Sequence, residues 1–167
     1  FLVAGAMIIT RCISVANARQ SVDLQTLLTI CAAFGLGTAL VNAGVVEAVA
    51  GMVADTVGAW GPYAVLMGVY ILTSVFTEVV TNNAAAALMF PFAVAFGQQI
   101  GASPRPFVMA VAFAASASFM TPLGYQTNLM VFGPGGYRFS DFVRLGLPLN
   151  LLLMLVATIL IPFVWHF

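Results

Sequence analysis

The chain has 167 residues and a formal net charge of zero, and 62% of its residues are hydrophobic whereas only 6% are charged. All five basic residues are arginines, so this composition cannot supply the polar surface of a water-soluble protein. A neutral chain without clustered basic residues also gives no reason to expect nucleic acid as a partner. The composition therefore predicts an integral membrane protein.

Four uncharged stretches reach or exceed the roughly 20 residues that a membrane-spanning helix needs. They cover residues 24–46, 79–104, 106–137 and 145–165. Such continuous runs favour helices, because the strands of a membrane barrel would alternate polar and apolar residues over about 10 positions. We therefore expect an all-α integral membrane fold. The sequence starts at Phe1 in an apolar segment without a starting methionine, so we also expect it to be part of a longer protein.

The first region, residues 1–60, reads as scaffold-type transmembrane helices followed by an amphipathic helix. Its first helix is expected to run from residue 1 to about residue 18. Asp23 is a suitable N-cap for a second helix over 24–41, because its short carboxylate can accept a backbone N–H of the first turn.

The stretch 45–57, VVEAVAGMVADTV, shows the pattern of a short amphipathic helix. Its apolar residues recur at helical spacing and would form one stripe: Val45, Val46, Val49, Met52, Val53 and Val57. Because Glu47 and Asp55 lie off this stripe, we expect the helix to lie along the membrane interface rather than to cross the bilayer.

A polar cluster, TEVVTNN at 77–83, interrupts the apolar sequence that opens at 61. It divides the segment into two apolar halves of about 16 residues, each about 24 Å long as a helix. Such helices are slightly short for a full span. We therefore expect a re-entrant helical hairpin over 61–99, with residues 77–83 at its tip.

A second break is expected in the next apolar segment, 104–132. Pro122 and Gly124 interrupt the helical pattern within TPLGYQTN, residues 121–128. Residues 61–137 would thus form a transport-type region with a hairpin and a discontinuous helix. In the third region, 138–167, RFSDFVR is expected to be interfacial, and a last transmembrane helix is expected over residues 146 to 165.

The arginines test this layout, because cytoplasmic loops are enriched in basic residues. If the hairpin makes no net crossing, Arg11, Arg19, Arg138 and Arg144 lie on one side of the membrane, and Arg105 lies on the other. One net crossing would split the first four into two pairs. The four-to-one bias favours a re-entrant hairpin or two full spans, and the short half-lengths favour the re-entrant hairpin.

Two helix breaks at membrane depth create sites for ions of both signs. Free carbonyls at 77–80 and 121–124 attract cations, and free N–H groups at 82–85 and 126–128 attract anions. Non-helical backbone at this depth must be buried by protein or reached by water, so we expect the two breaks to face each other. Paired broken helices of this kind are typical of secondary transporters.

Other interpretations remain open at this point. Thr and Asn side chains can simply hydrogen-bond helices together, and Glu78 can be a proton or cation site or a structural acceptor that caps the hairpin. A channel or a purely structural membrane module would also fit. An enzyme is not expected, because Ser116 and Ser118 have no histidine at membrane depth to act as a base.

The segments TEVVTNNAAAALMFP and ASFMTPLGYQTNLMVFGPGGY resemble the second half of a divalent anion:sodium symporter, the solute carrier 13 type within the ion transporter superfamily. ARQSVDLQTLLTICAAFGLGTAL and RFSDFVRLGLPL also fit the second repeat of that family. The resemblance implies an elevator-type carrier with two inverted repeats, of which the first is missing here, and a homodimer. It implies Na⁺ as coupling ion with no other cofactor. We expect a multi-pass protein of the bacterial plasma (inner) membrane.

The resemblance also implies site residues. The family's Ser-Asn-Thr signature corresponds to Thr81-Asn82-Asn83. The sodium site would use Thr77, the Val80 carbonyl, Asn82 and the Gly124 carbonyl. The substrate site would use Thr81, Asn82, Asn83, Tyr125, Gln126, Thr127 and Asn128.

Two departures from the family pattern bear on the substrate. Asn83 replaces the last threonine of the signature, and Tyr125-Gln126 replaces the smaller Thr-Pro pair of dicarboxylate carriers. The GYQTN form resembles members linked to sulfate, and its larger side chains suit a smaller anion. The expected function is sodium-coupled transport of a small divalent anion such as sulfate or a dicarboxylate. The alternative is a proton-coupled anion transporter or an anion channel with Glu78 as the titrating group.

Overall fold

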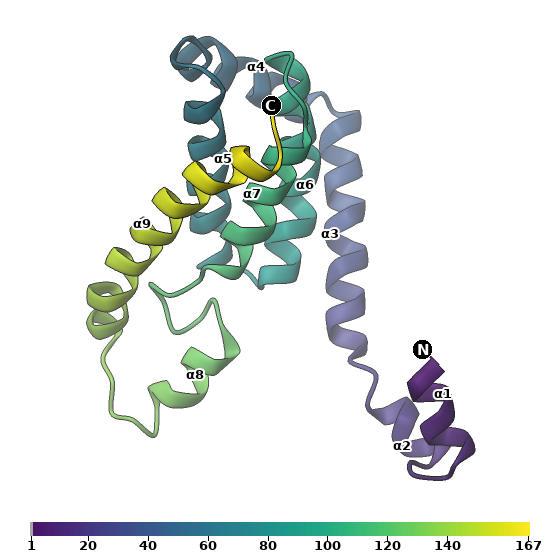
Figure 1. Ribbon diagram of the computed structural model, residues 1–167. Coiled ribbons are helices and arrows are strands. Elements are labelled where there is room, and N and C mark those ends of the chain that lie inside the picture. The colour runs from purple at the N-terminus through teal and green to yellow at the C-terminus, as the bar shows by residue number, and fades with distance from the viewer. Residues whose placement is uncertain (1) are drawn as a thin grey trace.

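The computed structural model describes residues 2–167, and all regular elements in this range are helices (Figure 1). The prediction of an all-helical chain is confirmed for these residues. Two segments are long and apolar enough to cross a membrane, Val15–Asn42 and Phe139–Val164. The shorter helices between these two segments include a hairpin and a broken helix.

The N-terminal segment contains two short helices, so the prediction of one helix reaching residue 18 is wrong. Helix α1 spans Leu2–Ile9 and α2 spans Val15–Gln20, and Phe1 lies outside the described residues. Arg11 has a φ of 59°, which is left-handed backbone that ends a right-handed helix. The hydroxyl of Ser14 then caps α2 by accepting the backbone N–H of Asn17 at 3.2 Å.

Helix α3, Leu24–Asn42, begins as predicted. The Asp23 side chain accepts the Thr26 backbone N–H at 3.0 Å, which confirms Asp23 as its N-cap. Helix α3 packs against α6 and buries Ala33 and Gly37. A β-carbon at Gly37 would lie 3.5 Å from the Pro91 ring of α6, in ordinary van der Waals contact.

Helix α4, Val45–Val57, has the predicted bounds, but its buried face is rotated from the predicted stripe. Val46 and Ala50 are buried, whereas Met52 is 69% exposed and Val45 is also exposed. The reason is packing, because α4 lies against α6 and presents the Ala50 side of the helix to the core.

A helical hairpin follows the 3-10 turn η1, Gly58–Trp60. Helix α5 spans Pro62–Thr77 and α6 spans Asn82–Gln99, and the two are antiparallel. Gly61 has a φ of 91°, which glycine adopts without strain, and Pro62 suits the first helical turn. Figure 1 shows that the tip of this hairpin stops short of the lower end of α3.

The broken helix begins with α7, Arg105–Ser116, and resumes as α8, Gln126–Phe132. Residues 117–125 between them are not helical, so the break starts four residues before the predicted 121–128. Neither proline nor glycine occurs in 117–120 to signal it. The backbone leaves the helix there because its polar groups bond to the hairpin tip, as described below.

The core is formed mainly by α5, α6 and α7. These helices contribute fully buried side chains that pack together: Val65, Leu66 and Val69 of α5, Ala93 and Phe96 of α6, and Phe107, Ala110 and Ala114 of α7. This packed layer supports the hairpin tip and the break from one side.

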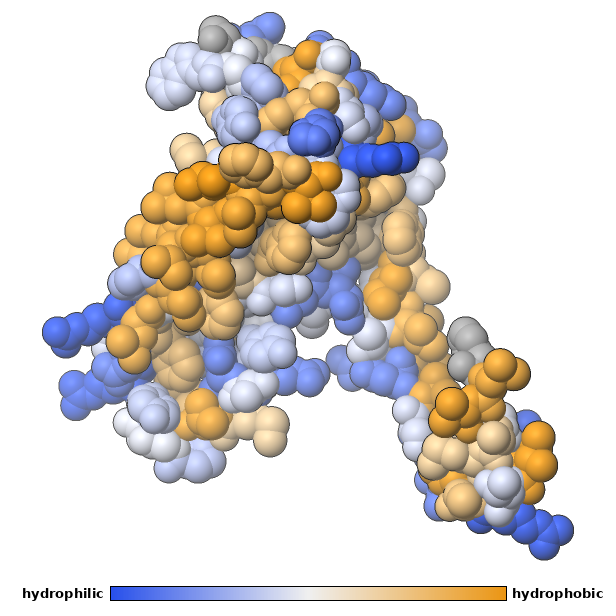
Figure 2. Space-filling model, viewed as in Figure 1, coloured by the Kyte–Doolittle hydropathy of each residue, from blue (hydrophilic) through white to orange (hydrophobic). Residues whose placement is uncertain are grey.

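Helix α9 spans Phe139–Val164 without interruption, so the separate interfacial segment and the last helix starting at 146 form one helix. Its 26 residues correspond to about 39 Å. It starts with a cap in which the Asp141 carboxylate accepts the Arg138 backbone N–H at 2.8 Å. Figure 2 shows a continuous apolar surface along α9, as expected for contact with lipid.

Candidate functional site at the hairpin tip and the helix break

The hairpin tip has a short turn that ends one helix and caps the next. Helix α5 ends at Thr77, and Thr81 is the N-cap of α6, where its hydroxyl accepts the Ala84 backbone N–H at 3.4 Å. The first residues of α6 are Asn82 and Asn83. The tip therefore places the C-terminal end of one helix next to the N-terminal end of another.

Glu78 fastens this tip to the break. Its side chain is only 5% exposed. One carboxylate oxygen accepts the Met120 backbone N–H at 3.0 Å and the Asn150 amide at 3.1 Å, and the other accepts the Thr121 backbone N–H at 2.8 Å. The Thr121 hydroxyl donates to the Glu78 carbonyl at 2.9 Å. All these groups donate to Glu78, so it acts here as an acceptor.

Gly124 allows the break to lie directly on the tip. A β-carbon at this position would collide with the Ser118 hydroxyl and would lie 2.6 Å from the Thr77 carbonyl oxygen. Ser118 itself is buried and donates to the Thr77 carbonyl at 3.2 Å. The Gly124 N–H donates to the Thr121 hydroxyl at 3.1 Å. Only glycine fits this close approach.

The side-chain amide of Asn82 is enclosed by oxygen atoms. Three of them face the same end of the amide: the Thr77 hydroxyl at 2.9 Å, and the carbonyls of Ala115 and Gly124 at 3.1 Å each. The Thr77 hydroxyl donates to the Ala115 carbonyl at 2.7 Å and is therefore free to accept. The hydrogen-bond network accordingly assigns the amide nitrogen to this end, where its two N–H groups face the three oxygens.

A polar pocket of about 480 Å³ adjoins this network. Three segments line it, the start of α3, the hairpin tip and the break. The lining residues are Asp23, Gln25, Thr26, Thr29, Thr81, Asn82, Asn83, Leu123, Gly124, Tyr125, Gln126 and Thr127. In Figure 2 hydrophilic surface gathers in the hollow between the lower part of α3 and the break. No basic side chain is among these lining residues.

Asp23 is the one acidic residue in this lining. Its pKa is lowered, first by the hydrogen bond from the Thr26 hydroxyl and then by that from the Thr26 backbone N–H. Asp23 therefore carries a negative charge at neutral pH. An anion that enters the pocket passes a carboxylate at the start of α3.

The pocket contains most of the residues predicted to bind substrate. Thr81, Asn82, Asn83, Tyr125, Gln126 and Thr127 line it. Asn128 does not line the pocket, because its amide donates to the carbonyls of Ser118 at 3.2 Å and Thr121 at 3.1 Å. These two hydrogen bonds join the first turn of α8 to the residues of the break.

Three of the four residues predicted for sodium lie together. Thr77, Asn82 and the Gly124 carbonyl are in one network. The Val80 carbonyl is not among the oxygens that face the Asn82 amide, and the Ala115 carbonyl lies there instead.

Several residues of the site are absent from the sequence-based prediction. These are Ala115, Ser118, Asn150 and the residues of α3 that line the pocket. Asn150 carries a usable signal, because it is the only polar side chain between Arg144 and Thr158 in an apolar segment. Ala115 contributes its backbone carbonyl oxygen, which every residue type has, so the sequence gives no signal for it.

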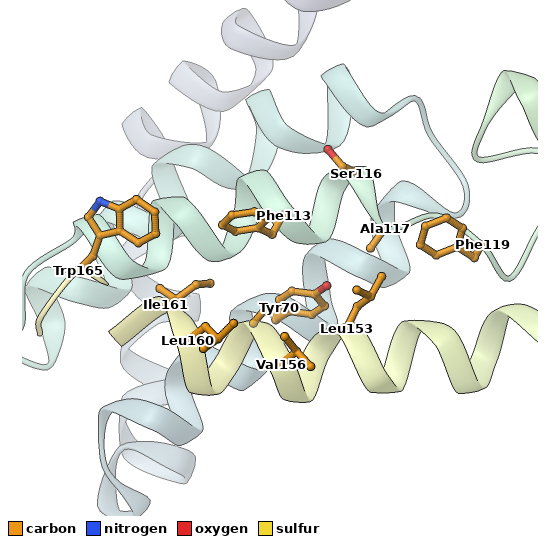
Figure 3. A pocket seen from close by; sticks show the side chains of 11 residues that line it. Tyr70, Phe113, Ser116, Ala117, Phe119, Leu153, Val156, Leu160, Ile161 and Trp165 are labelled. Atoms are coloured by element: carbon orange, nitrogen blue, oxygen red, sulfur yellow. The ribbon is translucent and has the colours of Figure 1, made fainter. Parts of the chain in front are cut away.

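A second pocket, of about 340 Å³, has a different character. Figure 3 shows side chains of α9, among them Leu153, Val156 and Ile161, opposite Phe113 of α7 and Tyr70 of α5. Its lining is almost entirely aliphatic and aromatic and holds no charged residue. We therefore place the candidate site in the polar pocket at the hairpin tip.

Comparison with known proteins gives the context of this site. The citrate transporter family model matches residues 1–107. Sodium/sulfate cotransporter 1 of Chlamydomonas reinhardtii is 37% identical over 168 residues, covering 99% of this chain and 19% of that protein. An uncharacterized transporter of Synechocystis sp. is 40% identical over 160 residues, which cover 96% of this chain and 26% of that protein. Solute carrier family 13 member 2 of Oryctolagus cuniculus is 33% identical over 100 residues, which cover 60% of this chain and 17% of that protein.

The chain spans 26% or less of the length of these three relatives. All of them carry names of transporters or solute carriers, and the family model covers more than half of the chain. These matches, together with the two apolar segments long enough to cross a bilayer, relate the chain to membrane transport proteins. The chain belongs to the citrate transporter family, and its sodium/sulfate cotransporter and solute carrier family 13 relatives are consistent with the divalent anion:sodium symporter family that its two polar motifs predicted.

Proposed function

We propose that this chain is the second repeat of a secondary transporter that moves a small divalent anion together with sodium, with sulfate as the favoured anion. A single observation carries the proposal. Asn82 is shared between a cluster of oxygens suited to a cation and a polar pocket suited to an anion. The name of the Chlamydomonas relative supports sodium and sulfate as the transported ions, and the description of the family model leaves citrate as an alternative anion.

The sodium site would be formed by the oxygens around the Asn82 amide. Thr77 lies at the C-terminal end of α5 and Ala115 at that of α7. Both helix ends carry partial negative charge, which favours a cation between them. With Gly124, these residues present one hydroxyl and two carbonyl oxygens, ligands that small hard cations prefer at broken helices.

Sodium binding would require the Asn82 amide to turn. Without a cation the two N–H groups of the amide face the three oxygens. A cation in that place repels the nitrogen, so the amide oxygen would turn towards it and the nitrogen towards the pocket. There the nitrogen can donate to an anion. Asn82 would thus couple the two ligands, because sodium orients the amide that binds the anion.

Charge balance supports coupling to sodium. The pocket holds Asp23 and no basic side chain, so a divalent anion finds no side chain that neutralises it. The start of α6, with Thr81, Asn82 and Asn83, offers N–H groups and the positive end of the helix dipole. Bound cations would supply the remaining positive charge and lower the cost of moving the loaded site across the bilayer.

The architecture fits the same proposal. The hairpin α5–α6 and the broken helix α7–α8 would form the transport-type half of one inverted repeat, with the hairpin re-entrant. Residues 1–60 would belong to the scaffold. By its resemblance to the family, the full-length protein would be an elevator-type homodimer, and we propose the bacterial inner membrane as its location.

Uptake by the full-length protein in proteoliposomes tests this function. We expect radiolabelled sulfate to accumulate when an inward sodium gradient is applied and not with potassium in its place. Unlabelled succinate and citrate, added as competitors, would establish the preferred anion. Asn82→Ala should abolish sodium-driven uptake, whereas Asn42→Ala, an exposed amide at the end of α3, should retain it. Uptake that is unchanged by Asn82→Ala would refute the site assignment.

The alternative is proton coupling, or an anion channel, with Glu78 as the titrating group. The contacts of Glu78 favour a structural role, because a proton on either carboxyl oxygen would face a donor. Uptake that follows a pH gradient without sodium would support proton coupling. Single-channel currents carried by sulfate would support the channel.

A further inference from the structure

We propose that Asn150 is a positioning residue for the sodium site and acts through Glu78. This inference rests on the proposed function. Asn150 lies on α9, is 5% exposed, and donates its side-chain amide to the Glu78 carboxylate at 3.1 Å. It is 72 residues away from Glu78 in the sequence, so the contact joins the last helix to the hairpin tip.

A continuous chain of hydrogen bonds leads from Asn150 to the oxygens of the sodium site. Glu78 accepts from Asn150 and from the backbone N–H groups of Met120 and Thr121. The Thr121 hydroxyl in turn accepts the N–H of Gly124. The Gly124 carbonyl is one of the three oxygens around the Asn82 amide. Asn150 therefore influences where this oxygen lies without touching the ion.

The orientation of Asn150 is fixed by its partner. Turning the amide would place its oxygen against a carboxylate oxygen of Glu78, which cannot donate. In the orientation that remains, the Asn150 amide oxygen is buried and has no hydrogen-bond partner within the described part of the chain. A buried unpaired oxygen is unfavourable. A leucine of similar size would avoid this cost, so the donor nitrogen explains why an amide occupies the position.

A glycine in α9 also allows this helix to lie close to the break, which the contact between Asn150 and Glu78 requires. Gly146 lies one turn before Asn150, and a β-carbon there would collide with the carbonyl of Phe119 and lie 2.7 Å from the Met120 nitrogen. This carbonyl and this nitrogen form one peptide group, and its N–H is the one that donates to Glu78. Close approach at Gly146 and hydrogen bonding at Asn150 thus act on one segment of the break.

The test measures the sodium concentration that gives half-maximal sulfate uptake by the full-length protein in proteoliposomes. Asn150→Leu keeps the volume and removes the donor. We expect it to raise this concentration about tenfold, as typically observed for residues that support a metal ligand, while the sulfate KM at saturating sodium changes less. Thr158→Val is the matched control. It removes another buried polar group of α9, a hydroxyl with no hydrogen-bond partner among the described residues, and should leave the sodium dependence unchanged.

A second variant keeps the proposal testable if Asn150→Leu does not fold. Asn150→Asp keeps the shape of the side chain and replaces the donating nitrogen with an oxygen, which faces the Glu78 carboxylate and repels it. We expect this variant to raise the sodium concentration for half-maximal uptake at least as much as Asn150→Leu does.

The outcomes separate the two proposals. Sodium-dependent uptake by the wild type, combined with unchanged sodium dependence in both Asn150 variants, would overturn the positioning role and leave the transport function intact. Wild-type uptake that ignores sodium would overturn both. An equal loss in Asn150→Leu and Thr158→Val would show a general packing role and would also overturn the proposal.

Discussion

The side-chain amide of Asn82 lies 3.1 Å from the carbonyl oxygen of Gly124, 42 positions along the chain, and joins the hairpin tip to the helix break. The two residues come from segments that each contain a polar interruption between apolar helices. Their contact brings the C-terminal ends of α5 and α7 together with the first turn of α6. The site is therefore built from helix ends more than from side chains.

Asn82→Asp should separate sodium binding from anion transport. Aspartate presents an oxygen on both faces, so the oxygens of Thr77, Ala115 and Gly124 gain a further cation ligand. Sodium should stabilise this variant against heat more than it stabilises the wild type. Sulfate uptake should fall more than about tenfold, because a carboxylate then faces the anion. Thermal unfolding in sodium and in potassium chloride, together with uptake, checks both expectations. Reduced stabilisation by sodium would argue against a cation in this place.

Gly124→Ala should disrupt the contact between the break and the tip. The added carbon meets the Ser118 hydroxyl and the Thr77 carbonyl, and the repacking should cost about 1–3 kcal/mol of stability. Sodium-dependent uptake should be lost even in protein that still folds, since the Gly124 carbonyl moves. Gly133→Ala is the control, because no atom lies within 4 Å of its β-carbon position. Equal transport by the two variants would contradict the proposed packing.

Asp23→Asn should improve the apparent affinity for the anion. The carboxylate lines the pocket and its pKa is lowered, so it stays ionised at neutral pH and repels a divalent anion. Asparagine still caps α3 but carries no charge. The sulfate KM should fall about twofold to fivefold at low ionic strength, and the difference should shrink as salt screens the charge. Asp55→Asn on α4 removes an exposed carboxylate away from the pocket and should leave KM unchanged.

Asp23 should give the wild type no pH dependence of the sulfate KM near neutral pH. Because the folded pKa of Asp23 is below that of an exposed aspartate, its cap stabilises α3 at neutral pH and this contribution is lost only as pH falls through the lowered pKa. Sulfate KM measured between about pH 6 and 8 should therefore show no change due to Asp23. A change in this range that persists in Asp23→Asn would come from another group.

The sequence was informative where local chemistry decides the structure. Asp23 before an apolar run predicted the start of α3, and the two polar motifs predicted where the hairpin turns and where the next helix is interrupted. It failed where long-range contacts decide. Residues 117–120 look helical, but the backbone N–H of Met120 bonds to Glu78 instead. Arg11 has left-handed backbone just after α1 with no proline or glycine beside it.

The candidate site shows the same division. Thr81, Asn82 and Tyr125 could be named from motifs that resemble a known family, because their side chains line the pocket. Ala115 could not, since a carbonyl oxygen is present at every residue and only the fold selects it. Asn150 is an intermediate case. A lone amide in an apolar helix predicts a buried partner, but its partner Glu78 lies 72 residues away.

Gly146→Ala should loosen α9 from the break and weaken sodium binding without changing any polar group. The added carbon collides with the Phe119 carbonyl and would lie 2.7 Å from the Met120 nitrogen, so α9 must move outward. The repacking should cost about 1–3 kcal/mol, and the longer Asn150–Glu78 contact should raise the sodium concentration for half-maximal uptake. Gly68→Ala in α5 meets no atom within 4 Å and should stabilise its helix by up to about 1 kcal/mol. Unfolding and uptake measured on both variants distinguish a specific effect of α9 from a general effect of alanine, because only Gly146→Ala should change the sodium dependence.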